Sequence, residues 1–456
     1  MKASWRALAI VAVMAGLAGC RTQAKRATSP TDTLPARALL DVDSPGEIYR
    51  PYDPEHVLAR LGGKATSPLG DEKEPARNLL ALSGGGMFGA YTAGVLKGWT
   101  ATGKRPEFDV VTGISTGSLI APFAFLGPEY DGTLEQRYTT IQASDIFSRR
   151  SWVTLLWADA LTDSAPLRHT IETEVDDAFL TKIAAAHASG RRLYVGTTNL
   201  ENKRLIVWDM GAIASSHRPN RGKLFRDVIL ASCSVPGVLP PVSIEVEVEG
   251  KVYTELHADG SVSASIFLDP YMVRDPGQKT PEQAERAVHR ANVYAIVAGK
   301  LYADPNQVRR RWLFVTGESV IGVLQARTEG DLMRLFLLAR FTGGAFHLAA
   351  VPQKLEIVGN ALGFDPVVMR QLFDVGYQSA VDRTAWRVTP PGIEPDEQRV
   401  PRVGNRFVID HNVQDNPKGQ SSFGPWQGLR DRFNAGLKSM NSALKARAGT
   451  SPPVQR

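Results

Sequence analysis

From Asn78 onward, short apolar runs alternate with longer segments in which apolar residues recur at helical spacing. The short runs predict strands at Asn78–Leu82, Phe108–Thr112, Arg192–Thr198, Arg204–Trp208, Val252–His257 and Asn292–Val297. The longer segments predict helices at Met87–Thr100, Ser115–Phe125, Leu167–His187, Lys223–Cys233, Asp331–Phe346 and Pro366–Asp382. This alternation is typical of an α/β domain, and we expect a central sheet that is mainly parallel.

The first twenty residues have the pattern of an export signal. A basic start precedes the apolar stretch Ala7–Ala18, which is too short to span a bilayer comfortably. Small residues lead directly into Cys20, as in bacterial lipoprotein signals. We therefore expect a signal peptide at residues 1–19 and lipid on the sulfur of Cys20; the alternative is a plain secretory signal with an incidental cysteine. The lipid would anchor the protein to a membrane on its periplasmic side, and Arg21 favours the outer membrane.

Changes in composition predict how the rest of the chain is organised. Residues 20–75 are rich in Pro, Ser, Thr and Ala, which indicates a tether after the lipidated cysteine. The α/β domain covers residues 76–385, and residues 386–456 hold a Pro-rich segment and a tail. Apolar residues at helical spacing predict an amphipathic helix in the tail: Trp426, Leu429, Phe433, Leu437, Met440 and Leu444. Such a basic helix either lies on an anionic membrane surface or packs on its own domain.

Composition excludes several classes of protein. With 456 residues, of which 43% are hydrophobic, the chain can bury a core and is not globally disordered. The net charge of +6 is mild and spread out, so we expect no nucleic-acid partner. Cys20 and Cys233 are the only cysteines. If Cys20 carries lipid, no intrachain disulfide forms, and Cys233 is a buried small hydrophobe. Cysteine and histidine spacings predict no metal site and no cofactor.

The pentapeptide Gly113–Gly117 follows a short apolar run and precedes a predicted helix. A strand that turns sharply into a helix holds a serine in a strained elbow with its hydroxyl exposed, and the flanking glycines avoid a clash of Cβ atoms. The helix N-terminus adds positive potential near the reacting oxygen. Ser115 is therefore a candidate nucleophile.

A second glycine cluster, Gly84–Gly89, also follows an apolar run. Its bare N–H groups suit an oxyanion hole, in which one donor is worth roughly 3 kcal/mol. The cluster also matches the dinucleotide pattern G-x-G-x-x-G, with Asp109 downstream, but the acidic residue of that fingerprint ends a strand and Asp109 begins one. A tight turn without function is the third interpretation. No Gly-Lys-Ser/Thr follows, which excludes a P-loop.

As a nucleophile, Ser115 would need a base that takes up its hydroxyl proton. A Ser-His-Asp triad calls for a late histidine, but His411 lies in the expected tail and His257 lies on a predicted strand. Asp259-Gly260 follows that strand, and a carboxylate within hydrogen-bond reach can deprotonate a serine directly. The alternative is a strand-ending turn. The other Asp-Gly pair, Asp131-Gly132, is interpreted as an ordinary turn.

Taken together, four segments resemble the patatin-like phospholipases. They are Ser83–Gly89, Gly113–Gly117, Ala231–Pro241 and Asp259-Gly260, in that order, and the resemblance spans residues 78–382. The combination is specific, although each motif alone is not. The motif glycines outside the expected oxyanion hole are Gly89, Gly113, Gly117 and Gly260.

The resemblance implies a fold and a chemistry. The fold is a three-layer α/β/α sandwich with a mainly parallel central sheet. The chemistry is hydrolysis of lipid acyl esters through an acyl-serine intermediate, without histidine or metal. Carried over, Ser115 is the nucleophile, Asp259 is the proton acceptor, and the N–H groups of Gly84, Gly85 and Gly86 form the oxyanion hole. The implied partner is a lipid or membrane surface, and the oligomeric state stays open.

Two residues depart from the family pattern. Many members carry Arg or Lys at the position of Phe88, where a cation suits a phosphate, so a neutral acyl ester becomes an alternative substrate. Ser261 stands where Gly or Ala is usual. The alternative functions are a carboxylesterase or lipase on neutral esters and a non-catalytic lipid-binding lipoprotein; a Rossmann-type binder is disfavoured.

Overall fold

The computed structural model describes residues 37–38, 76–149, 159–248, 251–269, 272, 290–304, 308, 310–341, 343–357 and 359–393. The chain divides into two compact units, Met1–Gln398 and Arg399–Arg456, and every described residue belongs to the first. The predicted signal peptide, Cys20, nearly all of the tether and the predicted tail helix lie outside the described residues.

The main sheet has nine strands within the described residues, in the order β1-β8-β9-β6-β3-β2-β10-β11, with β7 also paired to β6. A separate pair joins β4 and β5. The strands are β1 (Arg37–Ala38), β2 (Asn78–Leu82), β3 (Val110–Gly113), β4 (Ser148–Arg149), β5 (Thr162–Asp163), β6 (Arg192–Asn199), β7 (Arg204–Asp209), β8 (Val242–Val248), β9 (Lys251–Asp259), β10 (Asn292–Val297) and β11 (Ala345–Ala350).

The parallel part of the sheet consists of five neighbouring strands, β6, β3, β2, β10 and β11. Beyond β6, the strands β7, β9 and β8 join the sheet by antiparallel pairing. The parallel part confirms the expected sheet. Its strands are apolar on both faces because helices or other chain segments cover both. Along β2, Leu80 and Leu82 enter the core cluster on one face, and Leu79 and Ala81 enter the cluster on the other.

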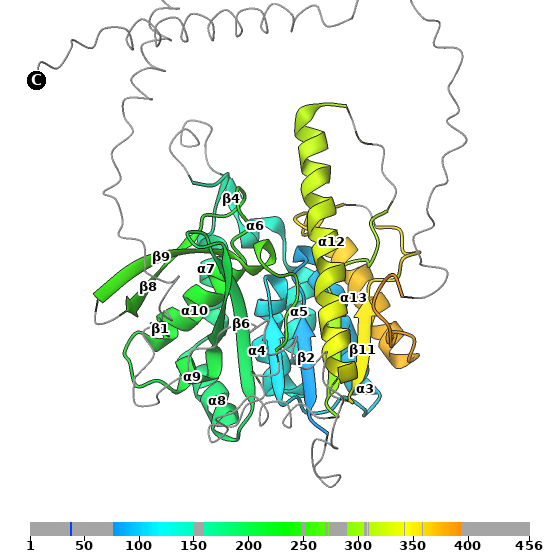
Figure 1. Ribbon diagram of the computed structural model, residues 1–456, viewed down its shortest axis with the longest axis horizontal. Coiled ribbons are helices and arrows are strands. Elements are labelled where there is room, and N and C mark those ends of the chain that lie inside the picture. Colours follow the sequence, from blue (N-terminus) through cyan, green and yellow to red (C-terminus); the bar gives the residue numbers. More distant parts are fainter. Residues whose placement is uncertain are drawn as a thin grey trace, which may run out of the picture. The chain divides into compact units, whose positions relative to one another are not determined.

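The helices form the outer layers (Figure 1). They are α3 (Gly89–Ala101), α4 (Thr116–Leu126), α5 (Asp131–Thr140), α6 (Ala143–Ile146), α7 (Ala165–Glu174), α8 (Asp177–Ala188), α9 (Met210–Ser215), α10 (Arg221–Ser232), α12 (Trp312–Phe341) and α13 (Pro366–Val381). Short 3₁₀ turns cover Gly86–Phe88, Pro128–Tyr130 and Gly260–Val262. Apolar residues of α3, α4, α10 and α13 fill the larger cluster, and the carboxyl-terminal half of α12 fills the other. The α/β/α layering agrees with the expected fold class.

Helices α3 and α13 pack unusually close together. A Cβ at Gly94 would lie 2.1 Å from the carbonyl oxygen of Phe373, and one at Gly376 would lie 2.3 Å from that of Tyr91. The missing side chains therefore set the spacing between the two helices, because no larger residue fits without moving a backbone.

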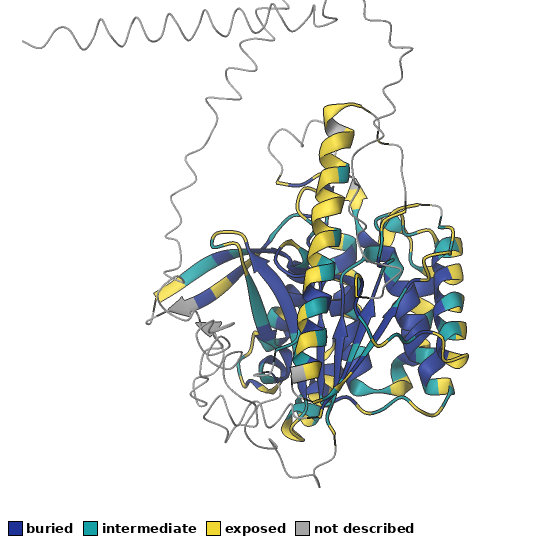
Figure 2. Ribbon diagram, turned by 45° about the vertical axis from the view of Figure 1, so that its right-hand side comes forward, coloured by how far each residue is buried: buried dark blue, intermediate teal, exposed yellow. Residues whose placement is uncertain are grey.

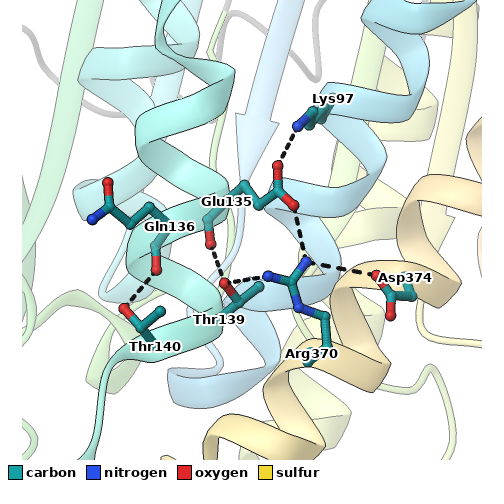
Figure 3. A network of polar contacts seen from close by, with 7 residues as sticks. All are labelled: Lys97, Glu135, Gln136, Thr139, Thr140, Arg370 and Asp374. Atoms are coloured by element: carbon teal, nitrogen blue, oxygen red, sulfur yellow. Dashed lines mark hydrogen bonds and ion pairs between the residues drawn. The ribbon is translucent and has the colours of Figure 1, made fainter.

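A polar network joins α3, α5 and α13 at the surface (Figure 3). The Glu135 carboxylate pairs with Lys97, and its other oxygen lies 2.9 Å from Arg370 Nη1. Arg370 also donates to the Thr139 hydroxyl at 2.9 Å and lies 3.8 Å from Asp374. Hydrogen bonding to Lys97, then to Arg370, lowers the pKa of Glu135. The side chains are partly exposed, so the network orients the helices more than it stabilises them.

Several predicted elements are placed differently by the structure. The helix expected at Asp331–Phe346 is wrong at both ends, since α12 begins at Trp312 and ends at Phe341, and β11 follows. Ala and Leu in β11 favour helix, but Gly343, with a φ of 68°, ends α12 first. The single helix expected at Leu167–His187 is two helices, because the Asp176 carboxylate accepts from Phe179 N–H and starts α8.

The strand β8 was not predicted, although Val242–Val248 alternates apolar and polar residues. Asp131-Gly132 is not a turn: it begins α5, and Asp131 makes a buried ion pair with Arg105 at 2.7 Å. None of the helices in the described ranges is long and apolar enough to cross a membrane.

The described residues just after the predicted domain boundary at 385 contact residues of the predicted α/β domain. The ring of Trp386 lies 4.7 Å from that of Trp99, and the backbones of Arg387 and Leu348 bond to each other in both directions. Trp99 and Trp386 thus form an aromatic cluster with Tyr294 of β10 and His347 of β11.

Candidate active site

Ser115 lies in a sharp turn between β3 and α4. Its φ is 52° and its ψ is −124°, a backbone conformation that costs a non-glycine residue about 1–3 kcal/mol. The turn requires glycine on both sides of Ser115. A Cβ at Gly113 would lie 2.4 Å from the Gly117 carbonyl oxygen, and one at Gly117 would lie 2.5 Å from that of Leu82. The predicted elbow is therefore present, with Ser115 at the N-terminus of α4, where the helix dipole favours negative charge.

The elbow is held from behind by the end of α10. Ser115 N–H donates to the Ser232 hydroxyl at 3.0 Å, and that hydroxyl donates to the Gly196 carbonyl of β6 at 2.7 Å. The Cys233 thiol lies 3.3 Å from the Ser115 carbonyl oxygen. Cys233 is free and buried, as expected. The segment Ala231–Pro241 is a motif in the sequence, but the sequence does not reveal that Ser232 holds the backbone of Ser115.

Strand register brings Asp259 to the same level as Ser115. The last residue of β3, Gly113, pairs with Val195 of β6. Two residues further along β6, Thr197 pairs with Asp259, the last residue of β9. Because β9 runs antiparallel to β6, its carboxyl end enters the site from the direction opposite to that of β3. Both strands therefore bring the two candidate residues to the same level of β6.

The carboxyl group of Asp259 is completely enclosed. Oδ1 accepts a hydrogen bond from Ser261 N–H at 2.8 Å, and Oδ2 makes no hydrogen bond of standard geometry within the described residues. Burial raises the pKa of Asp259 to about 6, against the opposing effects of the Ser115 hydroxyl and then of Ser261. A carboxylate with such a pKa is ionised at neutral pH and can still take up a proton.

The glycine loop lies against Ser115 and Ser261. A Cβ at Gly84 would lie 3.1 Å from Ser115 Cβ and 2.5 Å from Ser261 Oγ. Gly85 N–H and Gly86 N–H have no hydrogen-bond acceptor in the described part of the chain, whereas Gly84 N–H donates to the Ser265 carbonyl at 3.2 Å. Of the three expected oxyanion donors, Gly85 and Gly86 are thus available and Gly84 is engaged.

Backbone geometry explains the glycines of this loop. A Cβ at Gly85 would lie 1.9 Å from the Ala298 carbonyl oxygen. Gly86 has a φ of 56°, and a Cβ there would lie 2.0 Å from the Ala361 carbonyl oxygen. At Gly89, a Cβ would meet Thr116 Oγ1 at 2.4 Å, and at Gly260 it would meet the Gly196 carbonyl oxygen at 2.5 Å. The motif glycines are positions where the chain passes another segment closely.

The histidine considered as a base is engaged elsewhere. His257 Nδ1 lies 2.9 Å from Thr197 Oγ1, and Nε2 lies 3.1 Å from Glu255 Oε2. Trp208 donates to the same threonine hydroxyl at 2.8 Å. His257 is fully buried with both ring nitrogens occupied, which suits a structural role. His411 lies outside the described residues.

Asp109 does not support a dinucleotide site. Its carboxylate accepts a hydrogen bond from Asn78 N–H at 2.7 Å, at the amino ends of β2 and β3. The glycine loop follows the carboxyl end of β2, so the two features lie at opposite edges of the sheet. Among the described residues, no group of three or more His, Cys, Asp or Glu side chains is placed to hold a metal ion.

Residues 80–271 match the family model of the patatin-like phospholipases. The patatin-like segment contains the glycine loop, the elbow, the Ala231–Pro241 motif and Asp259. No curated protein matches the chain significantly. Among solved structures, the crystal structure of VipD from Legionella pneumophila is similar, with a TM-score of 0.37, 11% identity and coverage of 74% of each chain.

Proposed function

We propose that the patatin-like domain is a lipid acyl hydrolase that uses Ser115 as nucleophile and Asp259 as proton acceptor. The observation that supports this most directly is a strained serine at the start of a helix, placed by strand register at the same level as a buried carboxyl group. The family match supports lipid hydrolysis in general. The pairing of these two residues and the substrate are our own inference.

In the first half of the proposed reaction, Asp259 takes the proton of the Ser115 hydroxyl while Oγ attacks the ester carbonyl carbon. The carbonyl oxygen becomes negatively charged and lies near Gly85 N–H and Gly86 N–H, which stabilise it. The carbon–oxygen bond to the alcohol then breaks, and Asp259 returns the proton to the departing alkoxide. The product is an acyl-serine.

In the second half, water attacks the acyl-serine carbonyl carbon. Asp259 accepts a proton from the water, and the same N–H groups stabilise the second tetrahedral intermediate. The bond to Ser115 Oγ breaks, Asp259 returns the proton to this oxygen, and the fatty acid leaves. A pKa of about 6 suits both directions of proton transfer, because the carboxyl group is a competent base and a competent acid near neutral pH.

Matched variants test the proposed pair. We expect Ser115→Ala and Asp259→Asn to abolish hydrolysis of p-nitrophenyl esters and phospholipids, and Ser115→Ala to abolish labelling by a fluorophosphonate. Ser234→Ala and Asp109→Asn serve as controls, since they remove a buried serine hydroxyl and a carboxylate outside the pair. Full activity of both test variants would show that the pair is assigned wrongly. Unlabelled but folded wild-type protein would favour a non-catalytic lipid-binding role.

Phe88 favours neutral esters as the second candidate substrate class. Its side chain is partly buried against the core, where it contributes no positive charge for a phosphate. Turnover of phosphatidylglycerol and of triacylglycerol should be compared for the wild type and for Phe88→Arg. A gain in phospholipid turnover by the variant would support the neutral ester, and high wild-type phospholipid turnover would contradict it.

The predicted lipid on Cys20 places this activity at a membrane. We infer that the mature protein is a membrane-anchored lipoprotein on the periplasmic side, because small residues lead into the cysteine where the apolar run stops. Labelling of cells with radioactive palmitate should mark the wild type and not Cys20→Ser. Equal labelling of the two proteins would contradict the anchor.

A further inference from the structure

The long helix α12 is fixed to the site at its middle. The Asp331 carboxylate accepts a hydrogen bond from Ser265 N–H at 2.8 Å, and the Ser265 carbonyl accepts one from Gly84 N–H at 3.2 Å. Asp331 therefore marks the level of the glycine loop along α12. From this point toward its carboxyl end, the helix packs on the sheet through Leu332, Leu335 and Ala339.

The other half of α12, residues 312–330, extends beyond that level. Nineteen helical residues span about 28 Å at the usual rise, so the helix tip stands far out from the glycine loop. Figure 1 shows this half projecting past the carboxyl ends of the parallel strands, and Figure 2 shows it coloured mostly as exposed. A Cβ built at Gly317, Gly322 or Gly330 would find no described atom within 4 Å.

The projecting half carries several apolar side chains that are largely exposed. Trp312 is 79% exposed, Val323 68%, Val320 54% and Ile321 53%. Val315 and Leu324 are further exposed apolar side chains on this half. At 3.6 residues per turn, Trp312 and Ile321 point in directions about 180° apart, so apolar groups surround much of the helix. Soluble surfaces seldom expose so many apolar groups together without a partner.

Basic residues lie at the outer end of this apolar segment. Arg310 and Arg311 are exposed and directly precede Trp312. Arginine next to an aromatic residue and a mostly apolar helix suits the interface of a bilayer, where the cation meets anionic headgroups and the apolar groups enter the acyl region. A second copy of the helix would cover only one stripe of its surface, whereas fluid lipid can surround it.

We propose that residues 310–330 dock the protein on an anionic lipid bilayer, with the edge that holds Ser115 facing the membrane. This proposal rests on the proposed function, since it names the surface from which that site takes its substrate. Arg310 and Arg311 meet the headgroups, the apolar side chains enter the acyl region, and Ser265 and Asp331 join the glycine loop to the docked helix.

Vesicle binding tests the proposal independently of catalysis. All proteins are full-length and carry Ser115→Ala, to prevent hydrolysis, and Cys20→Ser, to prevent lipidation. Trp312→Ser/Val320→Ser/Val323→Ser should bind phosphatidylcholine–phosphatidylglycerol vesicles at least about tenfold more weakly than the parent. Arg310→Glu/Arg311→Glu should lose at least roughly fivefold per arginine on these vesicles and little on phosphatidylcholine alone. The control Val367→Ser/Val388→Ser removes exposed apolar side chains elsewhere and should bind like the parent.

Activity measurements separate this proposal from the proposed function. With Ser115 restored, the Trp312 triple variant should keep its turnover of a soluble p-nitrophenyl ester and lose turnover of vesicle lipid. If the wild type hydrolyses neither the soluble ester nor vesicle lipid, the proposed function is wrong, but the vesicle-binding result still stands. Unchanged vesicle binding by the triple variant would overturn the docking proposal, and so would a wild-type dimer that this variant converts to a monomer.

Discussion

The backbone N–H of Ser115 donates to the hydroxyl of Ser232, which in turn donates to the carbonyl of Gly196. One buried serine therefore connects the elbow, α10 and β6. Ser115 has a strained backbone, so its conformation depends on such neighbours. This relationship gives a role to a motif that the sequence shows only as a pattern.

Ser232→Ala should lower both stability and activity. The substitution leaves a buried N–H and a buried carbonyl without their partner, which costs about 1–3 kcal/mol for each group. The strained elbow relaxes, and kcat should fall more than KM changes. Urea unfolding and ester kinetics measure the two effects. Ser234→Ala is the control, because its buried hydroxyl donates to the Leu230 carbonyl at 2.8 Å. An equal loss of kcat there would contradict the role of Ser232.

Activity should rise with pH through the pKa of Asp259. Burial holds that pKa at about 6, and only the ionised carboxylate can accept the serine proton. The acidic limb of kcat/KM is therefore expected near pH 6. Ser261→Ala should move this limb to higher pH, since Ser261 lowers the pKa. Ser263→Ala should leave the limb in place, and a downward shift for Ser261→Ala would contradict the expected contact.

Asp259→Asn should stabilise the protein at neutral pH. The folded-state pKa is raised from 3.8 to about 6, so the folded state binds more protons between these values, and wild-type stability falls as pH rises through that window. The shift corresponds to at most roughly 3 kcal/mol at pH 7. Denaturant unfolding at acidic and neutral pH measures the difference. An equal pH dependence in wild type and variant would refute the raised pKa.

The close packing of α3 on α13 predicts a steric effect. Gly94→Ala should destabilise the protein by about 1–3 kcal/mol, because its Cβ would clash with the Phe373 carbonyl oxygen. Gly132→Ala in α5 is the matched control: nothing lies near its Cβ, so alanine should gain up to about 1 kcal/mol. Thermal unfolding compares them. A neutral Gly94→Ala would show that the helices can separate at little cost.

The apolar runs at β2, β3, β6 and β10 were predicted from sequence because buried parallel strands are apolar throughout. The elbow was also predictable, since few residues other than glycine fit beside a strained serine in a tight turn. Helix ends were less predictable. The strand β11 has helix-favouring residues, and only its pairing with β10 decides its conformation.

The sequence by itself determined the α/β class, the elbow at Ser115 and the glycine loop, because these depend on local periodicity and on residues without a Cβ. Only the tertiary structure decided what surrounds them. It places Asp259 level with Ser115 through strand register, engages Gly84 with Ser265, places Ser232 behind the elbow and leaves most of residues 312–330 exposed. These features depend on contacts between segments far apart in the chain, whose free energy no local pattern encodes.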